Sequence, residues 1–168
     1  AGAIDRWSGI GGDPHFVSGS ATAAFRSSRQ TRGVVASATA TVNAASLDAP
    51  LALWSGAGEG RGRSGLIRAH RLLYDGIIDG AIFGRRSGVI NLEVQRWFAV
   101  GVAALGIAGF TDIAAAGQRL PQAPGNAWQT DSGFGLRARV PGQPGTLRID
   151  YAYGLVDGQQ RISAGWNV

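Results

Sequence analysis

The carboxy-terminal stretch from Asp131 to Val168, DSGFGLRARVPGQPGTLRIDYAYGLVDGQQRISAGWNV, decides the fold class of this chain. It divides into three segments of near-equal length, Ser132–Val140, Thr146–Leu155 and Gln160–Val168. The sequences between them are rich in Gly, Pro and Asp, which is typical of tight turns. Within each segment the residue character alternates with a period of two, which predicts strands with two different faces. The stretch therefore predicts consecutive antiparallel β-hairpins.

The two faces of these predicted strands differ sharply in polarity. In the middle segment one face carries Leu147, Ile149, Tyr151, Tyr153 and Leu155, and the other carries Arg148, Asp150, Ala152 and Gly154. A soluble sandwich would bury the apolar face in its core and leave the charges in water. A transmembrane barrel would place the apolar face in lipid and the charges in its lumen. Segments of about ten residues match the strand length that a membrane barrel needs.

The rest of the chain adds further strands and one long loop. The loop, Leu47 to about Asp75, is rich in glycine, and a loop of this length inside a compact domain is usually functional or disordered. A second loop is expected at Ala114–Gln129. Strands are expected at Ala1–Gly12, Phe16–Ser28, Arg32–Ser46, Gly76–Gly84, Gly88–Phe98 and Val100–Ile113. We therefore expect residues 1–168 to form a single all-β, antiparallel domain, or part of one, with about eight strands.

Composition excludes several classes of protein. The chain has 168 residues, no cysteine and an excess of five positive charges, and all sixteen basic residues are arginine. These arginines are scattered, without a basic helix or interleaved stacking aromatics, so nucleic acid is not an expected partner. The longest uncharged apolar stretch, Trp97–Phe110, is too short for a membrane helix, which needs about twenty residues. A helical membrane protein is therefore excluded, and a membrane β-barrel is not.

The sequence offers no candidate catalytic or metal site. Gly60–Gly65 fits the pattern GxGxxG, but no strand–helix unit surrounds it, and the absence of lysine excludes a P-loop. Thr130-Asp131-Ser132-Gly133 opens a strand and forms no nucleophile elbow. The two histidines, His15 and His70, are isolated from each other and from suggestive nucleophiles or carboxylate pairs. We expect no enzyme, no cofactor and no metal ligands.

A further set of residues occurs in a characteristic order. Arg68 lies in the long loop, Glu93 lies in a later strand, and Phe110 and Asp112 end the strand after that. With Gly133-Phe134-Gly135-Leu136-Arg137 and the Leu147–Leu155 strand, this order resembles the carboxy-terminal half of the bacterial surface-antigen barrel superfamily. That superfamily includes the BamA-type outer-membrane assembly factors and the two-partner-secretion translocators. Where its pattern has glycine, an aromatic, glycine and a terminal aromatic, this chain has Ala69, His70, Ala114 and Val168.

The resemblance implies a fold, a function and a set of site residues. It implies an antiparallel transmembrane barrel of roughly sixteen strands, of which this chain would supply about half. It implies a non-catalytic role in inserting or translocating proteins at the bacterial outer membrane. The implied partners are outer-membrane lipid, client outer-membrane or secreted proteins, and another chain or segment that completes the barrel. The implied site is a loop-to-wall pair, Arg68 and Asp112, supported by Phe110 and Glu93, with Trp166 and Val168 as the terminal-strand signal.

Three other interpretations remain open. The barrel could be structural or pore-forming without a client, or it could anchor an upstream passenger domain. A small soluble β-sandwich or β-barrel binding module would explain the alternation equally well. It explains less easily why Arg137, Arg139, Arg148 and Asp150 share one face of neighbouring strands with interspersed glycines. Arg68 could likewise be a solvated loop residue and Asp112 an ordinary charge at a strand end.

Overall fold

The structure is a computed structural model, and it describes residues 2–7, 15–28, 33–56, 67–71, 73–74, 77–78, 82–119 and 127–167. The described chain is an all-β fold dominated by one eight-stranded antiparallel sheet. Its strand order is β1-β2-β3-β8-β9-β10-β11-β12, so every neighbour in the sheet is also the next long strand in the sequence. These strands are β1 (Gly2–Trp7), β2 (Phe16–Arg26), β3 (Gly33–Ala45), β8 (Arg86–Val100), β9 (Ala103–Gly117), β10 (Trp128–Arg139), β11 (Thr146–Gly154) and β12 (Gln160–Asn167).

Tight turns connect β8 to β9, β10 to β11 and β11 to β12, and glycine makes their geometry accessible. Gly101 between β8 and β9 has φ 57°, Gly142 between β10 and β11 has φ 76°, and Gly158 between β11 and β12 has φ 75°. Residues with a Cβ rarely adopt such positive values, whereas glycine adopts them at no steric cost. The hairpins predicted for the carboxy-terminal stretch are therefore confirmed.

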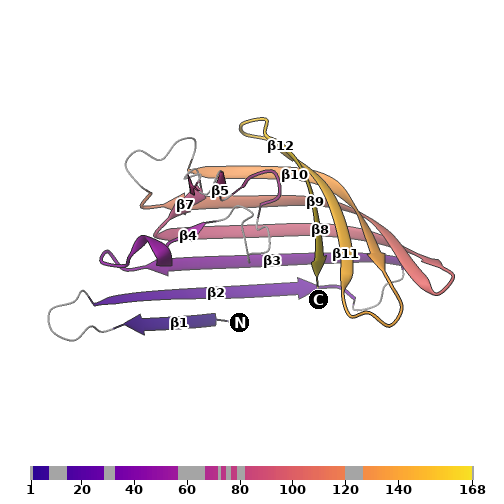
Figure 1. Ribbon diagram of the computed structural model, residues 1–168, viewed down its shortest axis with the longest axis horizontal. Helices are drawn as coiled ribbons and strands as arrows, with labels where there is room; N and C mark the ends of the chain where they lie inside the picture. Colours follow the sequence, from indigo (N-terminus) through magenta and orange to yellow (C-terminus); the bar gives the residue numbers. More distant parts are fainter. Residues whose placement is uncertain are drawn as a thin grey trace.

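The sheet is open at both edges. Among the described residues β1 pairs only with β2, and β12 pairs only with β11. Figure 1 shows that the part of the sheet from β10 to β12 curves over the flatter part formed by β1, β2 and β3. The antiparallel all-β prediction is confirmed, and the described chain does not close into a barrel.

Two sequence predictions about strands and loops were wrong. Gly76–Gly84 is not one strand: the described residues there form two-residue strands, β6 (Ile77–Ile78) and β7 (Phe83–Gly84). The Phe83 ring stacks on Trp54, 5.7 Å between centroids, so it packs in a small separate cluster and not in the sheet. The predicted loop Ala114–Gln129 is strand at both ends, because β9 runs to Gly117 and β10 starts at Trp128.

The long irregular segment contains only short elements where it is described. They are the 3-10 helix η1 (Leu51–Leu53), β4 (Ser55–Gly56), which pairs with β7, and β5 (Leu73–Tyr74), which pairs with β6. β4 lies against β8 and β7 against β9, near one end of the sheet (Figure 1). No described helix is long and apolar enough to cross a membrane.

The two faces of the sheet differ in polarity. On the inner, concave face Asp112, Asp131 and Asp150 are 0% exposed. On the outer face the large apolar side chains are exposed, including Phe134 at 66% and Ile162 at 73%. Cross-strand register places them on one continuous surface that spans β3 and β8 to β12. That surface, called the apolar outer face below, consists of Val34, Val42, Ile90, Leu92, Val94, Phe98, Leu105, Ile107, Ile113, Phe134, Leu136, Leu147, Ile149, Tyr153, Ile162 and Trp166.

Candidate functional site

Residues 67–71, called the loop segment below, lie on the inner face of the eight-stranded sheet, which is called the wall below. They place Arg68 among carboxylates from three strands. Arg68 Nε lies 3.2 Å from Asp112 Oδ2 of β9, and Arg68 Nη1 lies 2.7 Å from Glu93 Oε2 of β8. The same Nη1 lies 3.5 Å from Asp150 Oδ2 of β11. The guanidinium carbon sits 3.8 Å from the centroid of the Phe110 ring, and the side chain is 6% exposed. The four residues expected to form the loop-to-wall contact thus meet at one point.

Arg137 of β10 extends this cluster into an alternating chain of charges. Its Nη2 lies 2.9 Å from Glu93 Oε1, and its Nη1 donates to Asp150 Oδ1. Glu93 therefore bridges two arginines, one from the loop and one from the wall. The amide of Asn91 donates to Asp112 Oδ1 over 2.9 Å and holds that carboxylate in place. Removal of one partner from a buried ion pair of this kind is strongly destabilising, because the remaining buried charge is left unpaired.

Two glycines of β10 make room for this network. A Cβ added at Gly135 would collide with Asp150 Oδ1 and lie 2.7 Å from Arg137 Nη1. A Cβ added at Gly133 would lie 2.6 Å from Cζ of Phe110 and would also collide with the backbone of β11. The alternation of glycine with Phe134 and Leu136 therefore has a physical cause: inner-face positions of β10 are occupied by side chains from neighbouring elements.

His70 forms a second contact between the loop segment and the wall, which no sequence pattern predicted. His70 Nδ1 lies 2.9 Å from Asp131 Oδ1 of β10, and its Nε2 lies 2.9 Å from Asp157 Oδ2 in the β11–β12 turn. The amide of Ala69 donates to Asp131 Oδ2 over 2.6 Å. The expectation that His70 is isolated from carboxylates was therefore wrong. Its carboxylate partners follow it far along the sequence, so local spacing could not reveal them.

The electrostatics of this second contact favour a charged histidine. Burial lowers the pKa of His70, but the hydrogen bonds and negative charges of Asp131 and Asp157 outweigh it, and the pKa ends above its ordinary value. For Asp157, partial burial raises the pKa. The hydrogen bonds from His70 and from the Gln159 amide lower it by more, so the pKa ends below its ordinary value. Each partner thus stabilises the charged form of the other.

Apolar contacts also hold the loop segment against the sheet. Ala69 is 3% exposed and packs with Phe110 and Ala152, so the position that has glycine in the resembled pattern accommodates alanine here. Ile67 is fully buried and clusters with Ile82, Val89, Ala114 and Ala116. The segment is therefore held by ion pairs, a backbone hydrogen bond and apolar packing together.

The remaining sequence-predicted residues lie elsewhere or outside the described residues. Trp166 is on the outer face, 44% exposed, and its Nε1 donates to the carbonyl of Pro144 over 3.0 Å. Val168 and the Gly60–Gly65 pattern lie outside the described residues. Among the described residues no group of three or more potential ligands is arranged to hold a metal ion. The site is thus an electrostatic docking point whose ionic groups are largely paired with each other.

No protein-family model and no curated protein matches the chain.

Proposed function

We propose that this chain forms part of the wall of a bacterial outer-membrane β-barrel that inserts proteins into the outer membrane or moves them across it. The proposal rests mainly on the contrast between the two faces of the sheet. Large apolar side chains are exposed on the outer face, and buried carboxylates and arginines line the inner face. Contiguous exposed apolar surface of this extent marks contact with a membrane or a partner. A lipid-facing outer wall around a polar interior is the arrangement of membrane barrels.

The occupied inner face favours a barrel larger than eight strands. The interior of an eight-stranded barrel is just wide enough for its own side chains. Here residues 67–71 and their ion pairs already occupy that space beneath β8 to β11. Closing β12 onto β1 would therefore require room that a narrow barrel does not have. The additional strands would come from another segment of the protein or from another chain, because an open sheet edge is not stable within lipid.

The role in protein insertion rests on two further features. One is the resemblance in motif order, whose loop arginine and strand aspartate are the ion pair Arg68–Asp112. The other is the edge of β12, which pairs only with β11 among the described residues. At its junction with the additional strands, a weakly paired edge can template an incoming strand through main-chain hydrogen bonds. Together these two features support a role in which the sheet binds the loop segment on its inner face and pairs with a client strand at its edge.

The test is client folding in reconstituted liposomes. The full-length protein is incorporated into liposomes, an unfolded outer-membrane barrel protein is added, and its folding is followed by heat-modifiable gel mobility. We expect faster folding than in protein-free liposomes, and slower folding with Arg68→Ala than with the outer-face control Arg96→Ala. Equal rates with and without the protein would refute the insertion role. Ion conductance without client folding would favour the pore-forming alternative.

A further inference from the structure

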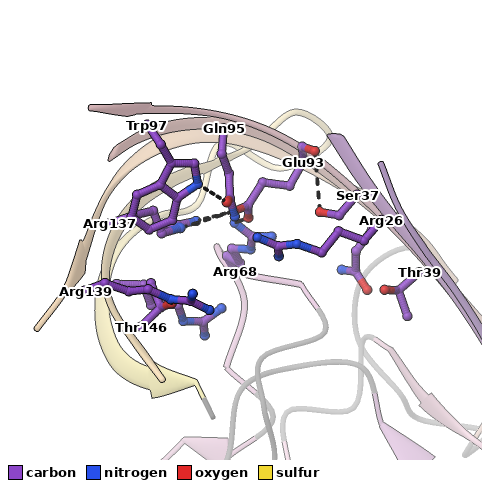
Figure 2. Close-up of a pocket in the computed structure, with 12 residues that line it drawn as sticks. Arg26, Ser37, Thr39, Arg68, Glu93, Gln95, Trp97, Arg137, Arg139 and Thr146 are labelled. Atoms are coloured by element: carbon purple, nitrogen blue, oxygen red, sulfur yellow. Dashed lines mark hydrogen bonds and ion pairs between the residues drawn. The ribbon is translucent and has the colours of Figure 1, made fainter. Parts of the chain in front are cut away.

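The inner face carries a cavity that the loop-to-wall pairing does not fill. It has a volume of about 280 Å³ and lies between the loop segment and strands β2, β3, β8, β10 and β11. Figure 2 shows Arg68 near its centre, Arg139 and Thr146 on one side and Arg26 on the other. The guanidinium groups of Arg26, Arg68, Arg137, Arg139 and Arg148 line it, with Glu93 as the lining carboxylate.

The arginines of this cavity exceed the carboxylates that pair with them. Arg68 and Arg137 are matched by Glu93, Asp112 and Asp150. Arg139 donates to the hydroxyl of Thr146 and Arg26 to the carbonyl of Ser28, and neither has a carboxylate partner within the described residues. Five guanidinium groups against three carboxylates leave an excess of two positive charges around one cavity.

Arg148 indicates what the excess charge is suited to bind. It is the direct cross-strand partner of Arg137, and like charges in that position destabilise a sheet unless they are neutralised. Its closest carboxylate oxygen, Asp150 Oδ2, lies 3.8 Å from Nη1. Its Nε is buried and has no hydrogen-bond partner within the described part of the chain. The side chain is 11% exposed and rests on Gly165 of β12, where an added Cβ would lie 3.3 Å from Nε.

We propose that this cavity is a binding site for a small phosphate-bearing anion, held by Arg148 and Arg139, with Arg26 on the opposite side. Planar guanidinium groups bind phosphate through paired, charge-assisted hydrogen bonds. Donors that approach from two sides suit a tetrahedral group with several acceptor oxygens better than a planar carboxylate. The cavity is far larger than the roughly 30 Å³ of one water molecule, so a phosphate group fits. The inference depends on neither membrane insertion nor protein translocation, because it rests on the inner face alone.

The test is isothermal titration of the purified, folded protein with inorganic pyrophosphate in a chloride buffer. We expect binding by the unaltered protein and about tenfold weaker binding by Arg148→Gln, the change expected for loss of a hydrogen bond to a charged group. Arg139→Gln, at an exposed position that can be altered without disturbing the buried network, should weaken binding in the same direction. Arg96→Gln removes the same charge from the outer face and should leave the affinity unchanged.

Three results would overturn this assignment. They are absence of pyrophosphate binding by the unaltered protein, equal affinity losses for Arg139→Gln and Arg96→Gln, and tighter binding of citrate than of pyrophosphate. The last result would identify a carboxylate site in place of a phosphate site. Thermal unfolding of each variant shows whether it remains folded, and Arg139→Gln decides the question if Arg148→Gln does not fold.

Discussion

Asp112 of β9 and Asp131 of β10 are direct cross-strand partners, and both are 0% exposed. Two adjacent buried carboxylates repel each other and would be costly to hold together without cations. The loop segment supplies one partner to each: Arg68 contacts Asp112, and His70 contacts Asp131. The wall and the loop segment are therefore electrostatically complementary, and docking of residues 67–71 is part of what makes this inner face stable.

The first prediction concerns the coupling between Arg68 and Asp112. Arg68→Ala and Asp112→Ala should each increase proteolytic cleavage on the amino-terminal side of Ile67, because each change weakens docking of the loop segment. Arg68→Ala should have the larger effect, since Arg68 also contacts Glu93 and Asp150. The double variant should be no more sensitive than Arg68→Ala alone, because interacting residues give non-additive effects.

Limited proteolysis followed by mass spectrometry measures this coupling. Arg96→Ala is the control, because Arg96 is exposed on the outer face and its guanidinium lies 5.8 Å from the Phe98 ring centroid, away from the loop. Additive effects of the two single changes would show that Arg68 and Asp112 act independently.

The second prediction concerns glycine on the inner face of β10. Gly135→Ala should destabilise the protein by about 1–3 kcal/mol, the usual cost of overpacking, because the added methyl collides with Asp150 and crowds Arg137. Gly109→Ala is the matched control in β9, since an added Cβ there meets nothing within 4 Å. Denaturant unfolding of both variants gives the comparison. Equal stability of the two would show that the space around Gly135 is not limiting.

The third prediction concerns pH. The folded pKa of His70 lies above 6.5, so its contribution to stability is fully present below pH 6.5 and is lost as the pH rises through the folded value. The folded pKa of Asp157 is lowered, so its contribution is present above about pH 3.8 and is lost as the pH falls through the folded value. The contact of His70 with Asp131 and Asp157 should therefore be strongest in mildly acidic solution.

Hydrogen exchange of the Ala69 amide reports on this contact, because that amide donates to Asp131. After correction for intrinsic exchange, its protection should be greater at pH 6 than at pH 9. His70→Gln should remove most of this difference. Protection that does not change with pH in the unaltered protein would contradict the assignment of a charged His70.

Sequence periodicity predicted the strands of the sheet better than the contacts of the site. β11 was predictable because its Leu147, Ile149 and Tyr151 contrast strongly with Arg148 and Asp150. The end of β9 was not, because Ala114, Ala115 and Ala116 alternate between buried and exposed without any difference in side-chain polarity.

The site was predictable only through motif order. The ion pair Arg68–Asp112 was expected from a resemblance, since no local pattern links a loop arginine to a distant strand. The contacts of His70 with Asp131 and Asp157 depend on how the loop segment crosses the inner face. Strand parity could have placed Asp131 on the same face as Arg137, but it could not have supplied the histidine.

The most direct test of the central claim compares cysteines at two adjacent positions of β3. Thr39 lines the inner cavity, and Ala40 is exposed on the outer face and pairs with Ile90. Thr39→Cys and Ala40→Cys proteins are placed in lipid bilayers and treated with a membrane-impermeant maleimide. If the outer face contacts lipid, Cys at position 39 should react and Cys at position 40 should be protected until detergent replaces the bilayer. Faster labelling at position 40 than at position 39 in the bilayer would contradict the membrane barrel, because the outer face would then be in water.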